Sequence, residues 1–409
     1  MMSTARRLAA PLLLALLLTG FHSTNAQQSW GFNNDSYRYS RAAFELLGLP
    51  RQEAQLKSRD AYCASRPDLT ACLAANPRGI EPDHPRYERI FDTRPGYPLL
   101  AAPFIAVFGA LKGLWMLSFL LTAASGLLTY TLLRVSGLSR LPSLAGEAVL
   151  LTGGLGYWGT RALADSLVTP CLLLCGIGSV YVLAGRRKAG LGMLLGGLLV
   201  LALTKYSTAL LLAVTLAAAS ALYAWRTARH VPRRFALTTR TSERHRAWTA
   251  LTLASAGAAL WIGAVTALLG LPAASETVQD TLTRHFIRPD VPDPVRGILT
   301  LEVTYWPTWF HYNVGFALLL GLCLWTLWHH RPQLLPIALA TGLTGLGTAF
   351  AHPLLEELDR LWVVAWVPVA LGVPVLVQAL STRSTASLPG ARPAQDLSGY
   401  RRSRRPSLS

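Results

Sequence analysis

The chain has 409 residues, of which 52% are hydrophobic and only 14% are charged. This balance excludes an ordinary soluble globular domain and indicates a polytopic membrane protein. The formal net charge of +17 is typical of the basic residues that orient membrane helices and attract anionic lipid, so we expect no nucleic-acid partner.

Apolar runs that approach the roughly 20 residues needed to cross a bilayer as helix predict about ten spans in residues 1–380. The run from residue 189 to 225 would extend roughly 55 Å as one helix, so it must be two helices that turn near Thr204 and Lys205. The predicted fold is therefore an all-α, polytopic transmembrane helix bundle. The predicted spans cover residues 8–21, 114–133, 144–159, 166–184, 189–225 (two helices), 248–271, 314–328, 334–351 and 361–380.

The first span follows Arg6 and Arg7 and precedes Thr24-Asn25-Ala26, so a retained helix and a cleavable signal peptide both fit. We expect a retained helix. In either case the basic flank stays in the cytosol, so residues 22–96 form a large first external loop. Alternating spans then place both termini in the cytoplasm if the first span is uncleaved. The cytosolic segments contain most of the basic residues, including the loop 226–247, and only three acidic ones.

The segments outside the predicted spans are few. Proline and glycine break the loop 22–96 into short helical pieces, such as residues 35–47. Cys63 and Cys72 are its only cysteines; a disulfide in an oxidising compartment is expected, with two unpaired thiols as the alternative. A second external loop, residues 272–313, ends in an aromatic stretch typical of the membrane interface, with stacking on a sugar as the alternative. The basic tail, residues 381–409, is predicted to be disordered and cytoplasmic.

Ionisable residues avoid the span interiors, apart from Glu147 near the end of one span. This absence argues against a proton-coupled carrier. By contrast, the predicted external ends collect many charged groups, which suits a site that takes a lipid tail between helices and holds an anionic headgroup beside them. These groups are Asp35, Arg94, Arg161, Asp165, Lys205, Arg284, His285, His352, Glu356, Glu357, Asp359 and Arg360.

The order of several short motifs resembles the GT-C superfamily of membrane glycosyltransferases, in particular the mannosyltransferase-like members. The resemblance extends over most of residues 1–365. Its motifs are Asn33-Asn34-Asp35-Ser36-Tyr37-Arg38-Tyr39, Arg94-Pro95-Gly96-Tyr97-Pro98-Leu99-Leu100, Arg161-Ala162-Leu163-Ala164-Asp165-Ser166, Leu203-Thr204-Lys205-Tyr206, and His352-Pro353 with Asp359-Arg360-Leu361.

This resemblance implies an enzyme of the cell envelope with its active face outside the cell membrane. It would transfer a sugar with inversion from a polyprenyl-phosphate donor to a glycan, lipid or protein acceptor. Asp35 would be the catalytic general base, without an acidic neighbour in the sequence that would make a two-carboxylate site. No cofactor and no metal are expected. Donor-phosphate or substrate binding would fall to Arg94, Tyr97, Lys205, His352 and Arg360.

Each of these residues also has a purely structural interpretation. Asp35 could cap a helix that begins at Ser36, and Lys205 could reach the membrane interface by snorkelling. Arg94 could anchor an interfacial helix over residues 97–108. Local ion pairs would explain the others: Arg161 with Asp165, and Arg360 with Asp359 or Glu356. His352, next to Pro353, could be an interfacial residue.

Two other functions stay open. One is a transporter or flippase of lipid-linked envelope precursors, and the other is a non-catalytic membrane protein of envelope assembly. The strong excess of arginine over lysine is associated with GC-rich bacterial genomes.

Overall fold

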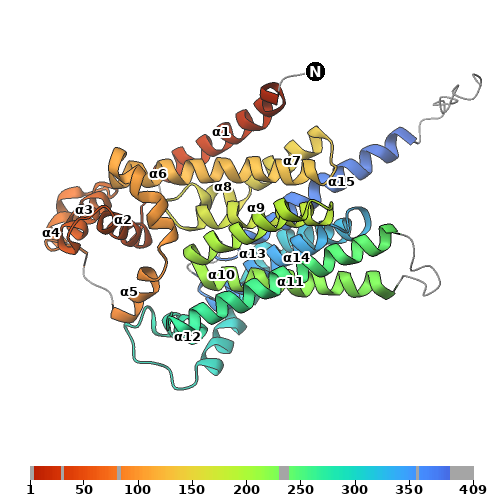
Figure 1. The fold of residues 1–409 in the computed structure, drawn as a ribbon. Helices are drawn as coiled ribbons and strands as arrows, with labels where there is room; N and C mark the ends of the chain where they lie inside the picture. Colours follow the sequence, from red (N-terminus) through yellow and green to blue (C-terminus); the bar gives the residue numbers. More distant parts are fainter. Residues whose placement is uncertain (1–3, 29–31, 81–83, 230–238, 356–358, 387–409) are drawn as a thin grey trace, which may run out of the picture.

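The computed structural model describes residues 4–28, 32–80, 84–229, 239–355 and 359–386. Within these ranges the fold is all α-helical and contains no β-strand. Long helices pack side by side, while short helices gather at one end of the bundle, which is the left end in Figure 1. The predicted all-α class is confirmed.

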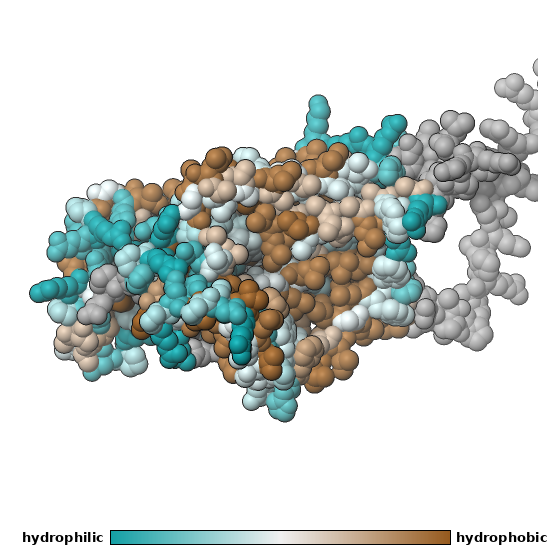
Figure 2. Space-filling model, turned by 90° about the horizontal axis from the view of Figure 1, so that it is seen from below, coloured by the Kyte–Doolittle hydropathy of each residue, from teal (hydrophilic) through white to brown (hydrophobic). Residues whose placement is uncertain are grey.

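Seven of the described helices are long and apolar enough to cross a membrane. On the face that Figure 2 shows, a broad hydrophobic surface lies next to a strongly hydrophilic end. The chain is therefore a multi-pass membrane protein, as the composition predicts. The seven helices are α1 (Thr4–Gln28), α6 (Gly96–Val135), α9 (Asp165–Leu183), α10 (Arg187–Arg229), α11 (Thr239–Leu268), α13 (Pro294–His330) and α15 (Trp366–Ala386).

The predicted count of about ten spans is not confirmed. The predicted span 144–159 is divided between two short helices, α7 (Arg140–Thr152) and α8 (Gly154–Gly159). The predicted span 334–351 corresponds to α14 (Leu335–Ala351), which is apolar but shorter than the helices counted above. The predicted pair in residues 189–225 belongs to the single helix α10.

Helix α10 is broken at Lys205, where the backbone leaves the helical region (φ −149°, ψ 83°). Leu183, just before α10, and Arg226, near its end, line one cavity. Both ends of α10 therefore lie at the same end of the bundle, and its two halves run antiparallel. This geometry confirms the predicted turn near Thr204 and Lys205.

Helix α6 also reverses direction. Gly109 has a φ of +75°, in the left-handed region that favours glycine. Beyond it the backbone of Gly113 lies so close to Phe104 that a Cβ on Gly113 would be 2.7 Å from the carbonyl oxygen of Phe104. A short helix up to residue 108 is thus folded against a membrane-crossing helix. It corresponds to the helix predicted over residues 97–108.

Four short helices follow α1 within the predicted loop 22–96: α2 (Asn34–Leu46), α3 (Arg51–Ala64), α4 (Leu69–Ala75) and α5 (Pro85–Asp92). The first residues of that loop, up to Gln28, belong to α1. An ion pair between Arg41 and Glu88 (2.8 Å) joins α2 to α5. The ring of Tyr39 packs against both Phe91 and Tyr97, which holds α2 on α5 and α6.

The segment predicted as a second external loop, residues 272–313, is largely helical. It contains α12 (Ala274–Thr283) and the first part of α13, up to a break at Asn313. Tyr305 and Trp309 are fully buried, and Trp309 packs against Trp362. Those two rings of the aromatic stretch therefore form core and do not mark an interface. A 3₁₀ turn, η3 (Val363–Ala365), leads into α15.

Two predicted basic segments are described only in part. In the loop 226–247, α10 continues to Arg229 and α11 begins at Thr239, while residues 230–238 lie outside the described ranges. In the tail 381–409, α15 continues to Ala386, and residues 387–409 lie outside them.

A disulfide joins Cys63 in α3 to Cys72 in α4, with their Cα atoms 5.4 Å apart. Cys63 is buried, whereas no residue of α4 is. This covalent link, together with the hydrogen bonds from Arg59 to the carbonyls of Asn76 and Pro77, holds the short helix α4 against α3.

We predict that replacing both cysteines by serine (Cys63→Ser, Cys72→Ser) destabilises the α3–α4 region by about 2.5 kcal/mol, the loop-closure value for a ring of this size. Limited proteolysis at Arg66 and Arg78 measures the effect as faster cleavage, and a reducing agent should reproduce it in the native chain. Equal protease resistance of the variant and the native chain would contradict the prediction.

Candidate functional site

A cavity of about 350 Å³ lies at the end of the bundle that carries the short helices. One part of its wall is apolar and includes Leu211, Phe350 and Leu361. The other part is ionisable and comes from segments far apart in the sequence. Its ionisable lining residues are Asp35, Arg94, Lys205, Asp280, His285, His352 and Arg360.

Asp35 is placed in this wall by the start of α2. The helix begins at Asn34, and Asn33 is its cap: the Asn33 side chain accepts a hydrogen bond from the Ser36 amide, and the Ser36 hydroxyl accepts one from the Asn33 amide. The same hydroxyl donates to the carbonyl of Ala162, which fixes the helix start on the bundle. The interpretation of Asp35 as the cap is therefore wrong, and its carboxylate faces the cavity.

An alternating chain of charges runs across the floor of the site. Arg360 donates to Asp35 (Nη2 to Oδ2, 2.7 Å) and to Asp165 (Nε to Oδ2, 3.1 Å). Lys205 donates to the other oxygen of Asp165 (Nζ to Oδ1, 2.6 Å). The four side chains are only 12–17% exposed, so solvent screens these pairs less than pairs on an open surface.

The network corrects one local pairing expected from the sequence and adds distant partners to a second residue, Arg360. Asp165 pairs with Lys205 and Arg360 and not with Arg161. Arg161 is buried, lies over the ring of Tyr157 at 3.2 Å, and donates to the Tyr157 carbonyl. Arg360 reaches Asp35 and Asp165, while Glu356, one of its expected partners, lies outside the described residues.

A second carboxylate thus lies beside Asp35, across the shared guanidinium of Arg360. The sequence did not predict it, because Asp35 and Asp165 are remote in the chain. The available signal was the position of Asp165 at the start of a long apolar helix, where a charged residue is out of place unless it is paired.

Burial opposes ionisation of Asp35, but the charge and hydrogen bond of Arg360 outweigh it, with smaller contributions from Arg38 and Lys205. The pKa of Asp35 is therefore lowered, and the carboxylate is fully ionised at neutral pH. In this state Asp35 is a weak base because a cation holds its negative charge.

Arg94 precedes α6 and Tyr97 lies in its first turn, yet the two side chains occupy different positions. Arg94 lines the cavity, lies 6.0 Å from the ring of Tyr206, and has no carboxylate partner among the described residues. Tyr97 is fully buried behind the wall, where its hydroxyl hydrogen-bonds to Ser118 (3.1 Å). Tyr97 does not line the cavity and packs in the core, so its substrate contact stays a prediction.

The opposite wall carries two histidines. His352 hydrogen-bonds through Nδ1 to the hydroxyl of Thr281 (2.5 Å), and His285 through Nδ1 to Asp280 (3.1 Å). Burial lowers the pKa of His352 to about 4, whereas the hydrogen bond that His285 donates to the Asp280 carboxylate raises the pKa of His285. The sequence did not single out Asp280, which looks like an ordinary polar residue of α12.

The backbone after α12 is unusual. Arg284, His285 and Phe286 have φ values of 50°, 62° and 61°, all in the left-handed region. This conformation costs roughly 1–2 kcal/mol for each residue with a side chain. It places the ring of His285 on that of Tyr87, with the centroids 4.3 Å apart. Strain of this kind is often found at functional sites.

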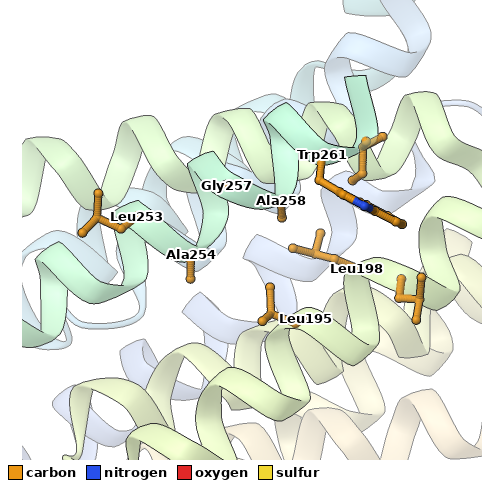
Figure 3. A pocket seen from close by; sticks show the side chains of 9 residues that line it. Leu195, Leu198, Leu253, Ala254, Gly257, Ala258 and Trp261 are labelled. Atoms are coloured by element: carbon orange, nitrogen blue, oxygen red, sulfur yellow. The ribbon is translucent and has the colours of Figure 1, made fainter. Parts of the chain in front are cut away.

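A separate groove of about 410 Å³ runs between α10 and α11 (Figure 3). Its walls are formed by Leu195 and Leu198 on one side and by Ala254, Ala258 and Trp261 on the other. All of its lining residues are uncharged, so it suits the packing of apolar chains and offers no acid, base or nucleophile.

Comparison of the chain with protein-family models finds no match, and comparison with curated protein sequences finds none either. Among the described residues, no group of three or more histidine, cysteine or acidic side chains is placed to hold a metal ion.

We predict that Asp35 makes the protein sensitive to acid. Because its folded pKa lies below the ordinary value of 3.8, its charge stabilises the fold above that pH, and this stabilisation is lost as the pH falls further. Asp35→Asn should flatten the fall of the unfolding temperature below about pH 4. Asp60→Asn, an exposed control in the same region, should keep the native slope. An unchanged slope in Asp35→Asn would disprove the prediction.

His352 should act in a different pH window. Its folded pKa of about 4 is below the ordinary 6.5, so on acidification the unfolded chain takes up a proton first, and stability falls between these two values. His352→Gln should remove part of that fall in thermal unfolding measured from pH 7 to pH 4. The exposed His311→Gln is the control. Identical curves for His352→Gln and the native chain would refute this assignment.

Proposed function

We propose that the chain is a membrane glycosyltransferase that moves a sugar from a polyprenyl-phosphate donor to an acceptor hydroxyl, with Asp35 as general base. The proposal includes an extracytoplasmic location for the cavity end of the bundle. Its main support is that the carboxylate of Asp35 shares one cavity with the cations Arg94, Lys205 and Arg360. The motifs that resemble the GT-C superfamily add to it, since they contribute all four of these residues.

The shape of the cavity fits an amphipathic, anionic donor. A phosphate needs cations and hydrogen-bond donors, which Arg94, Lys205 and Arg360 supply. An isoprenoid chain needs an apolar route, and the wall around Leu211 and Phe350 offers one at the side of the bundle. Phe350 is half exposed, so this wall extends to the outer surface of the helices.

Arg94 is the cation best placed to meet the donor first. Arg360 and Lys205 are already engaged by Asp35 and Asp165, whereas Arg94 has no carboxylate partner among the described residues. The phosphate would bind to Arg94 and then compete with the two aspartates for Arg360 and Lys205.

This competition would activate the base. When Arg360 turns to the phosphate, Asp35 loses the largest contribution that lowers its pKa, while burial continues to raise it. Its basicity therefore increases only when a donor is present. Asp165 would keep Lys205 and Arg360 in place between turnovers, as a positioning residue.

The chemical step follows from these positions. The acceptor oxygen forms a bond to the anomeric carbon while its proton passes to the carboxylate of Asp35. The bond between that carbon and the phosphate oxygen breaks, and the lipid phosphate leaves with the electron pair. Negative charge grows on the leaving oxygen in the transition state, where the neighbouring cations stabilise it.

We predict that Asp35→Asn lowers kcat roughly 10²- to 10⁴-fold, the range attributed to a general base. The substitution should not weaken donor binding, because the carboxylate does not contact the phosphate and competes with it for Arg360. The assay incubates purified protein with labelled polyprenyl-phosphate sugars and envelope extracts. Asp60→Asn, which changes an exposed carboxylate, should remain fully active.

Undiminished transfer by Asp35→Asn from every active donor would rule out this mechanism. If the native chain transfers no sugar but moves a lipid-linked precursor across liposome membranes, the chain is a transporter. If the native chain binds the donor but neither transfers sugar nor moves the precursor, a non-catalytic role in envelope assembly would be favoured.

A further inference from the structure

A second cavity, of about 610 Å³, lies at the opposite end of the bundle from the Asp35 site. It is formed where α6, α9 and α10 end, where α11 begins, and after α13. Its walls combine two arginines, Arg226 and Arg244, with the rings of Tyr223, Trp248 and Trp328.

The charge of this cavity selects an anion. Its described lining contains both guanidinium groups and no acidic side chain. Arg226 lies over the ring of Trp328 at 4.3 Å, which orients its planar group without neutralising it. Arg331 is close to the rim, where it donates to the carbonyl of Gly137, next to the lining residue Ser136.

The rest of the wall selects an amphipathic molecule. Val135, Val180 and Leu183 provide apolar surface at the ends of α6 and α9. The rings of Tyr223 and Trp248 stack with centroids 5.1 Å apart, and tryptophan and tyrosine are enriched where a membrane meets water. A ligand with an anionic head and apolar chains would match both parts of the wall.

We propose that this cavity binds the phosphate headgroup of an anionic phospholipid, with Arg226 and Arg244 as its ligands and the acyl chains along Val180 and Leu183. Basic pockets between the ends of membrane helices recognise such headgroups. The bound lipid would clamp the ends of α9 and α10 together. This proposal is independent of sugar transfer.

The test measures thermal unfolding of the full chain in neutral detergent during titration with short-chain phosphatidylglycerol. The unfolding temperature should rise with this lipid and not with short-chain phosphatidylcholine. The double variant Arg226→Gln/Arg244→Gln should need roughly 30-fold more phosphatidylglycerol, at about 1 kcal/mol for each arginine. The double variant Arg187→Gln/Lys188→Gln removes two exposed charges at the same end, outside the cavity lining, and should respond like the native chain.

Equal stabilisation by the two lipids, or a native response of Arg226→Gln/Arg244→Gln, would overturn the proposal. Glycerol phosphate and inorganic phosphate form a further arm: if either reproduces the shift at the same concentration, the site binds free phosphate and not a lipid. If the double variant does not fold, the exposed Arg244→Gln alone decides the question by native mass spectrometry. It should retain less phosphatidylglycerol than the native chain, and equal retention would refute the proposal.

Discussion

The guanidinium group of Arg360, held between the carboxylates of Asp35 and Asp165, is the interaction on which the candidate site depends. It joins the first short helix, the start of α9 and the segment before η3. Without this cation, two partly buried negative charges would face each other in a region of reduced dielectric, where their repulsion is strong. The same contact closes one side of the cavity and sets the protonation of Asp35.

Breaks in the long helices complete the architecture. At Lys205 the backbone leaves the helical region, and the side chain at that residue reaches Asp165. Irregular backbone at membrane depth is tolerated where it is buried in protein or lines a cavity, and Lys205 lies in the cavity wall. The reversal at Gly109 similarly lets α6 begin next to Arg94 and still provide a membrane-crossing helix. The breaks at Lys205 and Gly109 are therefore what bring the charged side chains of Lys205 and Arg94 to the cavity.

The sequence predicted the features that depend on composition and length. Apolar runs indicated the membrane fold, and the excessive length of residues 189–225 required the turn at Lys205. The ion pairs of the site could not be predicted in the same way. The partners of Asp165 are separated from it by 40 and 195 positions, and only tertiary packing brings them together. The predicted span 144–159 is not a single helix, because hydrophobicity does not reveal that α7 ends at Thr152 and that α8 is very short.

Local rules gave a mixed result at α2. A cap was correctly expected at the start of this helix, but Asn33 and not Asp35 provides it, since both residue types satisfy the same preference. The two histidines of the site show what local rules cannot predict. His285 and His352 were visible as charged ends of segments, yet their opposite pKa shifts arise from Asp280 and from burial, which no local pattern reports.

The three left-handed residues after α12 limit which sequences this segment can accept. Although Arg284 is exposed, its backbone conformation suits glycine, asparagine or aspartate and excludes valine, isoleucine and threonine. Phe286 is restricted further, because its ring is buried as well. The tolerance of these positions to evolutionary drift is therefore much narrower than their place in a surface turn would indicate.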